Sequence, residues 1–142
     1  IGIFGAEATD LGLVEDLLML MYKHQADYTN TFRSLNRRSQ LSERLLSDQG
    51  FRHWMDKWNQ RLSRQAQSMG EAQALMDLHN PLVIPRNHLV EVALEDASKG
   101  DMQSFHEFLN VLLMPYNQPK DDKFLSAPDA NYDKNYRTFC GT

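Results

Sequence analysis

The chain has 142 residues, of which 42% are hydrophobic and 24% charged, with a formal net charge of −4. This balance excludes a chain that is disordered throughout and favours a soluble globular domain. The acidic net charge argues against nucleic acid as a partner. The longest apolar run, Leu17–Met21, is far shorter than the roughly 20 residues that cross a bilayer, so no membrane partner is expected.

The two ends of the sequence carry further expectations. The chain begins at Ile1 rather than Met, which indicates a piece of a longer protein. We find no secretory signal peptide and expect a cytoplasmic location. Cys140 is the single cysteine, so no internal disulfide can hold the fold together.

The first half of the chain shows helical periodicity. A stripe of apolar residues at i, i+3, i+4 and i+7 predicts a helix over Thr9–Ala26. Asp27 can cap a second helix that continues through Leu35, and Asp48 can cap a third over Gln49–Gln67. A short fourth helix is expected over Glu71–Leu78. The residues expected to face the core are Val14, Leu17, Leu18 and Met21 in the first helix, and Phe51, Trp54, Met55, Trp58 and Leu62 in the third.

The second half begins where Pro81 and Pro85 interrupt the helical pattern. A helical hairpin is predicted over residues 86–114, with Gly100 ending its first helix. The composition of residues 115–142 predicts an extended acidic and aromatic tail that either wraps over the helices or docks on another domain. No stretch alternates with the period of a strand. We therefore predict an all-α fold, a bundle-like domain of about five to six helices over residues 1–114 followed by this tail.

A search for reactive groups returns no complete catalytic apparatus. No two of the five histidines have the three- or four-residue spacing of helical metal ligands. There is no Gly-x-Ser-x-Gly elbow and no glycine-rich phosphate loop, and the paired carboxylates are sequence neighbours that point apart on a helix. The sequence therefore predicts no catalytic, cofactor-binding or metal-binding residue within this chain.

Two features remain as candidates. Residues 27–66 carry eight basic and four acidic side chains, and within them Arg33, Arg37 and Arg38 form a candidate docking surface. A solvated face is the simplest interpretation of these arginines, and contact with an acidic domain is favoured over contact with nucleic acid. Cys140 lies third from the end of the chain, where a thiol is accessible to oxidants, although its position alone favours an incidental cysteine.

Several motifs, taken together and in order, resemble the C-terminal region of the selenoprotein O/YdiU family. They are an Asn80-Pro81 pair followed by Arg86-Asn87, then Gly100-Asp101, then Pro115-Tyr116, at separations similar to those of the family. Residues 27–35 look like the family's DYT-x-x-F-R-x-L segment, and residues 54–62 look like its W-x-x-x-W-x-x-R-L segment. Family members also end with a cysteine or selenocysteine at the position of Cys140.

The resemblance implies a longer enzyme with a catalytic pseudokinase-like domain upstream, of which this chain is the terminal third or so. Such an enzyme transfers AMP from ATP to hydroxyl side chains of protein substrates, with Mg²⁺ or Mn²⁺ and ATP bound by upstream residues. This chain would then be structural or regulatory, with the upstream catalytic domain as its partner. The resemblance also implies that Cys140 is a redox switch that pairs with an upstream cysteine. The alternative is a stand-alone helical interaction module whose partner is unidentified.

Overall fold

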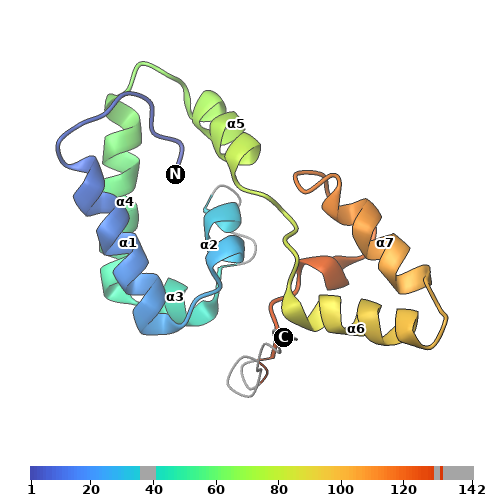
Figure 1. The fold of residues 1–142 in the computed structure, drawn as a ribbon. Coiled ribbons are helices and arrows are strands. Elements are labelled where there is room, and N and C mark those ends of the chain that lie inside the picture. Colours follow the sequence, from blue (N-terminus) through green and yellow to red (C-terminus); the bar gives the residue numbers. More distant parts are fainter. Residues whose placement is uncertain (36–40, 130–131, 133–142) are drawn as a thin grey trace. The chain divides into compact units, whose positions relative to one another are not determined.

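The computed structural model describes residues 1–35, 41–129 and 132. Within these residues the protein is all-helical, with seven α-helices, one short 3₁₀ helix and no strand (Figure 1). This confirms the predicted fold class. The chain divides into two compact units, Ile1–Leu82 and Val83–Thr142. The division falls in the segment where Pro81 and Pro85 interrupt the helical pattern.

The first unit contains five helices that enclose one apolar core. α4 runs beside α1, α3 contacts both of them, and α5 packs on α4 (Figure 1). The buried aromatic residues of α4 (Phe51, Trp54 and Trp58) stack in series along the helix and form the centre of this core. The bounds are α1 (Asp10–His24), α2 (Tyr28–Ser34), α3 (Glu43–Ser47), α4 (Gln49–Arg64) and α5 (Met69–His79).

Side-chain caps fix where most of these helices begin. As predicted, Asp27 accepts a hydrogen bond from the backbone N–H of Asn30, and Asp48 accepts one from that of Phe51. Ser68 forms a capping box with Glu71, so α5 begins two residues earlier than expected. Ser42 caps α3, the one short helix that the periodicity did not predict and the reason for seven helices rather than six.

The buried face of α1 is turned by one residue relative to the prediction. Leu13, Leu17 and Met21 are buried, whereas Leu18 is exposed. The sequence contains two overlapping apolar stripes on this helix, because Leu18, Met19 and Tyr22 are also apolar. Periodicity alone could not decide between the two stripes, and the contact with α4 selects the one that includes Leu13.

The second unit is built on the predicted hairpin, formed by α6 (Asn87–Ser98) and α7 (Gln103–Leu112). Gly100 has a φ of +91°, and the N–H groups of Gly100 and Asp101 donate to the carbonyls of Ala97 and Asp96. This is a Schellman motif, which needs a residue that tolerates the left-handed region at the glycine position.

The beginning of the tail packs on this hairpin. The 3₁₀ helix η1 (Asp122–Leu125) places the Phe124 ring parallel to that of Phe108, with 5.7 Å between the ring centroids. Phe124 and Leu125 are both buried. The backbone N–H of Val83 also donates to the carbonyl of Pro115, which ties the two ends of the hairpin together.

Candidate functional site

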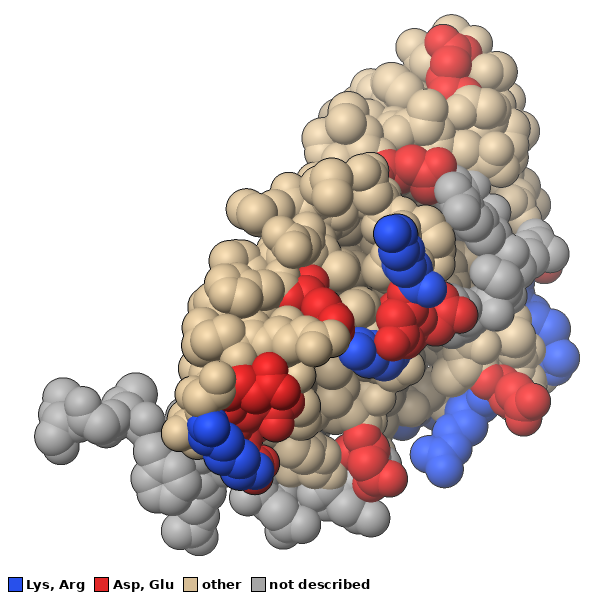
Figure 2. Space-filling view, turned by 90° about the vertical axis from the view of Figure 1, so that its right-hand side faces the viewer, with Lys and Arg blue, Asp and Glu red and all other residues tan. Residues whose placement is uncertain are grey.

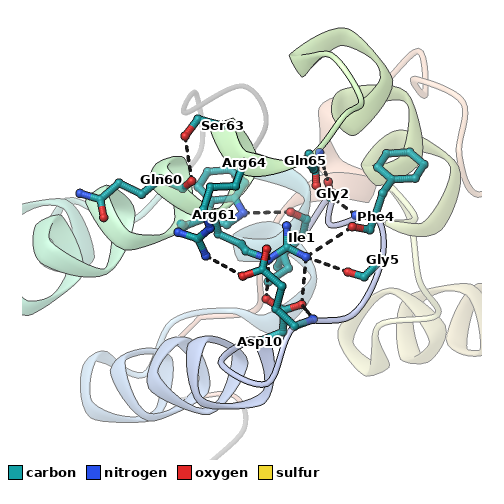
Figure 3. A network of polar contacts seen from close by, with 12 residues as sticks. Ile1, Gly2, Phe4, Gly5, Asp10, Gln60, Arg61, Ser63, Arg64 and Gln65 are labelled. Atoms are coloured by element: carbon teal, nitrogen blue, oxygen red, sulfur yellow. Dashed lines mark hydrogen bonds and ion pairs between the residues drawn. The ribbon is translucent and has the colours of Figure 1, made fainter.

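The most developed polar site of the first unit surrounds Arg61, whose residue exposure is only 3%. Its Nε donates to Oδ1 of Asp10 at 2.7 Å, and its Nη2 donates to Oδ2 of the same carboxylate at 3.1 Å. Nη2 also donates to the carbonyl of Gly5 at 2.7 Å (Figure 3). Glu7 adds a second carboxylate 3.3 Å from Nε. One guanidinium on α4 therefore holds the N-terminal segment and the start of α1.

The two tryptophans of α4 extend this attachment. Nε1 of Trp58 donates to the carbonyl of Ile1 at 2.9 Å, and Nε1 of Trp54 donates to the carbonyl of Leu13 at 2.7 Å. At the C-terminal end of α4, the side-chain amide of Gln65 accepts from the N–H of Phe4 and donates to the carbonyl of Gly2 (Figure 3). Indole N–H groups need an acceptor when they are buried, and these backbone carbonyls supply it.

We call this set the α4 clamp: Trp54, Trp58, Arg61 and Gln65 on α4, with the backbone and carboxylates of residues 1–13 that they hold.

The charges of the clamp stabilise each other. The hydrogen bond from Arg61 lowers the pKa of Asp10, and the hydrogen bond to Asp10 raises the pKa of Arg61. Both groups are therefore held in their charged forms across the physiological range. A carboxylate in this state is a poor proton donor, and a guanidinium is a poor base, so the clamp suits attachment rather than acid–base chemistry.

A second polar cluster joins three helices of the same unit. Oδ2 of Asp48 lies 2.8 Å from both Nζ of Lys23 and Nε2 of His24, while its Oδ1 accepts from the N–H of Phe51. The hydrogen bond from Lys23, followed by that from His24, lowers the pKa of Asp48. Asp48 ends α3 and begins α4, and its partners lie in the last turn of α1. One carboxylate thus fixes the junction of these helices.

The predicted site residues are only partly covered by the structure. Arg33 lies on α2 and is half-buried, whereas Arg37, Arg38 and Cys140 lie outside the described residues. The three arginines are therefore not brought together as a surface by what the structure describes. On the face drawn in Figure 2, basic and acidic side chains lie interspersed, and other residues cover most of the surface.

Among the described residues, no group of three or more histidine, cysteine, aspartate or glutamate side chains is placed to hold a metal ion. Within the same residues, no helix combines the length and the apolar character needed to cross a bilayer.

The family-like segment over residues 54–62 includes Arg61, but sequence reasoning assigned Arg61 no role and did not single out Asp10 as its partner. A signal was nevertheless present: Arg61 follows Trp58 by three residues and Trp54 by seven, so it falls on the buried stripe of an amphipathic helix. A charged residue on such a stripe must have a buried partner. The sequence could thus have identified Arg61 as the centre of an ion pair, but not Asp10 as its partner.

The motifs that resembled a known family all make intramolecular contacts. Trp54, Trp58 and Arg61 belong to the α4 clamp. The side chain of Asn80 donates to the carbonyl of Phe32 at 3.2 Å and so joins two of the motifs. The carbonyl of Pro115, which begins another motif, accepts from the N–H of Val83, a residue between the Asn80-Pro81 and Arg86-Asn87 pairs. These motifs therefore mark the contacts that define the fold.

Comparison with known proteins confirms the family resemblance. The family model described as "Protein adenylyltransferase SelO" matches residues 2–113. Proteins named "Protein nucleotidyltransferase YdiU" match the whole chain, with 44% identity in Alkaliphilus metalliredigens, 43% in a strain of Bacillus cereus and 41% in Alcanivorax borkumensis. The chain spans 29% of the length of the first two of these relatives and 30% of the third. The chain belongs to the SelO protein adenylyltransferase family.

Proposed function

We propose that this chain is the non-catalytic C-terminal region of a protein adenylyltransferase. In the reaction, a hydroxyl oxygen of a protein side chain loses its proton to solvent or a base and attacks the α-phosphorus of ATP, the bond to the β-phosphate breaks, and pyrophosphate leaves. The observation that carries the proposal is the family match over residues 2–113.

The nucleotide and the metal ion belong, in this proposal, to the part of the protein outside this chain. The relatives have about 70% of their length beyond the matched region, which is ample for a nucleotide-binding domain. ATP and Mg²⁺ or Mn²⁺ would bind there. The described residues of this chain offer no cluster of metal ligands, so we assign no step of the reaction to them.

The role of this region is to brace the catalytic domain. The α4 clamp makes residues 1–82 a unit with a defined N-terminal segment, so an upstream domain joined to that segment would be held close to a fixed support. We propose that Arg33, Arg37 and Arg38 contribute to docking against acidic groups of the catalytic domain or of a protein substrate.

Cys140 completes the proposal as a redox switch. Oxidation would join its sulfur to that of an upstream cysteine, with two electrons and two protons passing to an oxidant such as a disulfide. The disulfide would tie the tail to the catalytic domain and restrain its motion. Reduction would release the tail. The thiol stands at the position where the family that this chain resembles carries cysteine or selenocysteine.

The test is transfer of label from ATP labelled at its α-phosphate onto protein, using the full-length protein with and without a reducing agent. Labelling that rises on reduction, and that becomes insensitive to reduction in Cys140→Ser, supports both the activity and the switch. Labelling to the same extent with and without the reducing agent supports the activity but overturns the proposed redox switch. The absence of label under both conditions overturns the adenylyltransferase proposal and leaves an interaction module.

A further inference from the structure

The outer face of α1 exposes several apolar side chains within the first unit. Leu11, Leu18 and Tyr22 recur at i, i+7 and i+11, so they lie along one side of the helix. Tyr22 is 88% exposed, and the adjacent Met19 is 71% exposed. These side chains point away from the residues of α1 that build the core, namely Leu13, Leu17 and Met21. α1 therefore has one apolar side that packs into the core and a second, exposed apolar side that is available for contact with another surface.

This face continues into a groove between α1 and α4. The groove has a volume of about 680 Å³, and its lining is predominantly apolar. Leu18, Met19 and Leu20 form the α1 side, while Gly50 and Trp54 contribute from α4. Gly50 has no side chain to fill the space beside Leu20. A concave apolar surface next to protruding apolar side chains is typical of a protein contact rather than of a solvated helix face.

The charges around the groove are already neutralised within the chain. Lys23 pairs with Asp48 at 2.8 Å, and Lys57 lies 3.5 Å from a carboxylate oxygen of Asp16. A partner that covers the groove would not have to supply a counter-charge for either lysine. The chemistry of the surface therefore fits an apolar partner with a polar margin, such as one side of an amphipathic helix.

We propose that the outer face of α1 and its groove with α4 are the surface on which the remaining, larger part of the same polypeptide packs. This rests on the proposed function, in which that part is the catalytic domain. The relatives carry about 70% of their length outside the region matched here, so a full-length protein of similar size would hold a large partner on the same chain. Covalent linkage gives such a partner an effective concentration of the order of millimolar, which favours it over a second copy.

The experiment is hydroxyl-radical footprinting of the full-length protein, read by mass spectrometry and normalised to the denatured protein. The chain provides matched probes on its own first unit. Met19 is compared with Met69, which is 50% exposed, and Tyr22 is compared with Tyr28, which is 64% exposed. We expect Met19 and Tyr22 to be labelled roughly five-fold or more slowly than their matched partners, because the centre of an interface excludes solvent.

Light scattering of the same samples shows whether the protein is a monomer or a dimer. Slow labelling of Met19 and Tyr22 in the monomer supports the proposal. Labelling as fast as that of Met69 and Tyr28 overturns it. Slow labelling that is present only where a dimer forms also overturns it, because a second copy would then be the occupant. Footprinting needs no turnover, so a failed label transfer from ATP leaves its result unaffected.

A pair of variants gives an independent test in the full-length protein. Tyr22→Glu places a charge on the proposed contact, and Tyr28→Glu places the same charge on an exposed tyrosine of α2. We expect Tyr22→Glu to restore fast labelling of Met19 and to accelerate cleavage between the two parts by a dilute protease. Equal behaviour of the two variants in both measurements would overturn the proposal.

Discussion

Arg61 and Asp10 lie 51 residues apart in the sequence, yet two nitrogens of one meet two oxygens of the other at 2.7 and 3.1 Å. The pair joins the last turn of α4 to the first turn of α1. Paired hydrogen bonds of this kind fix orientation as well as distance. Arg61 also binds backbone carbonyls of the N-terminal segment, so a single side chain sets the course of the chain before α1.

The first prediction concerns the geometry of this contact. Arg61→Lys keeps the positive charge but cannot reach the Asp10 carboxylate and the Gly5 carbonyl together. We expect the free energy of unfolding to fall by about 1–3 kcal/mol, since buried acceptors lose their donor. Arg64→Lys is the matched control, because the exposed Arg64 pairs with Glu7 at the surface, and we expect a change below about 0.5 kcal/mol. Denaturant unfolding of both variants measures the difference, and equal losses would contradict the role of the clamp.

The second prediction separates the indole hydrogen bonds from aromatic packing. Trp58→Phe retains a ring beside Trp54 but removes the N–H that binds the carbonyl of Ile1. We expect a loss of about 1–3 kcal/mol in unfolding free energy, which includes the reduced ring volume. Amide hydrogen exchange of the first residues should also accelerate, because they lose one attachment to α4. Unchanged exchange in this segment would show that the Trp58 hydrogen bond does not hold it.

The third prediction uses two glycines of the first unit. Gly2 has a φ of +72°, and a Cβ there would lie 2.9 Å from the carbonyl oxygen of Ala72. Gly2→Ala should therefore cost about 1–3 kcal/mol through backbone strain and steric overlap. Gly12 lies within α1 with nothing within 4 Å of such a Cβ, so Gly12→Ala should stabilise by about 0.5–1 kcal/mol. Thermal melts of the two variants should shift in opposite directions, and shifts of the same sign would refute this assignment.

The fourth prediction concerns acid. Contacts with Arg61 and with Lys23 lower the pKa values of Asp10 and Asp48 below the ordinary value of 3.8. A lowered folded-state pKa gives stability that is fully present above this value and is lost as the pH falls below it. Unfolding free energies measured from about pH 6 to about pH 2 should therefore decline below about pH 4. Asp48→Asn keeps an N-cap acceptor for Phe51 but no charge, so its decline should be shallower than that of the unaltered chain.

Helices, their caps and the hairpin could be predicted from local sequence because their causes are local. Asp27, Asp48 and Gly100 act on residues within a few positions of themselves, and all three act as expected. The rotation of α1 could not be predicted in this way. Leu13 and Leu18 are equally apolar, and only the surface of α4, more than thirty residues further along the chain, makes one of them buried.

The contacts of the candidate site could not be predicted from local sequence either. The resemblance selected Trp54, Trp58 and Arg61, but their partners are backbone carbonyls of residues 1–13 and the carboxylate of Asp10. A backbone carbonyl has no signature in sequence, and any of several acidic residues near the N-terminus could have met Arg61. The arginines of the candidate docking surface remain a prediction, since Arg37 and Arg38 lie outside the described residues.

In the proposed function, the family motif on α4 supports the fold and takes no part in the chemistry. The most direct test compares melting temperature and the rate of AMP transfer for Arg61→Lys in the full-length protein, with transfer measured well below the melting transition. We predict a lowered melting temperature and a transfer rate within about twofold of the unaltered protein, because no transition-state contact is lost. A transfer rate reduced by about a hundredfold or more, with an unchanged melting temperature, would contradict the account.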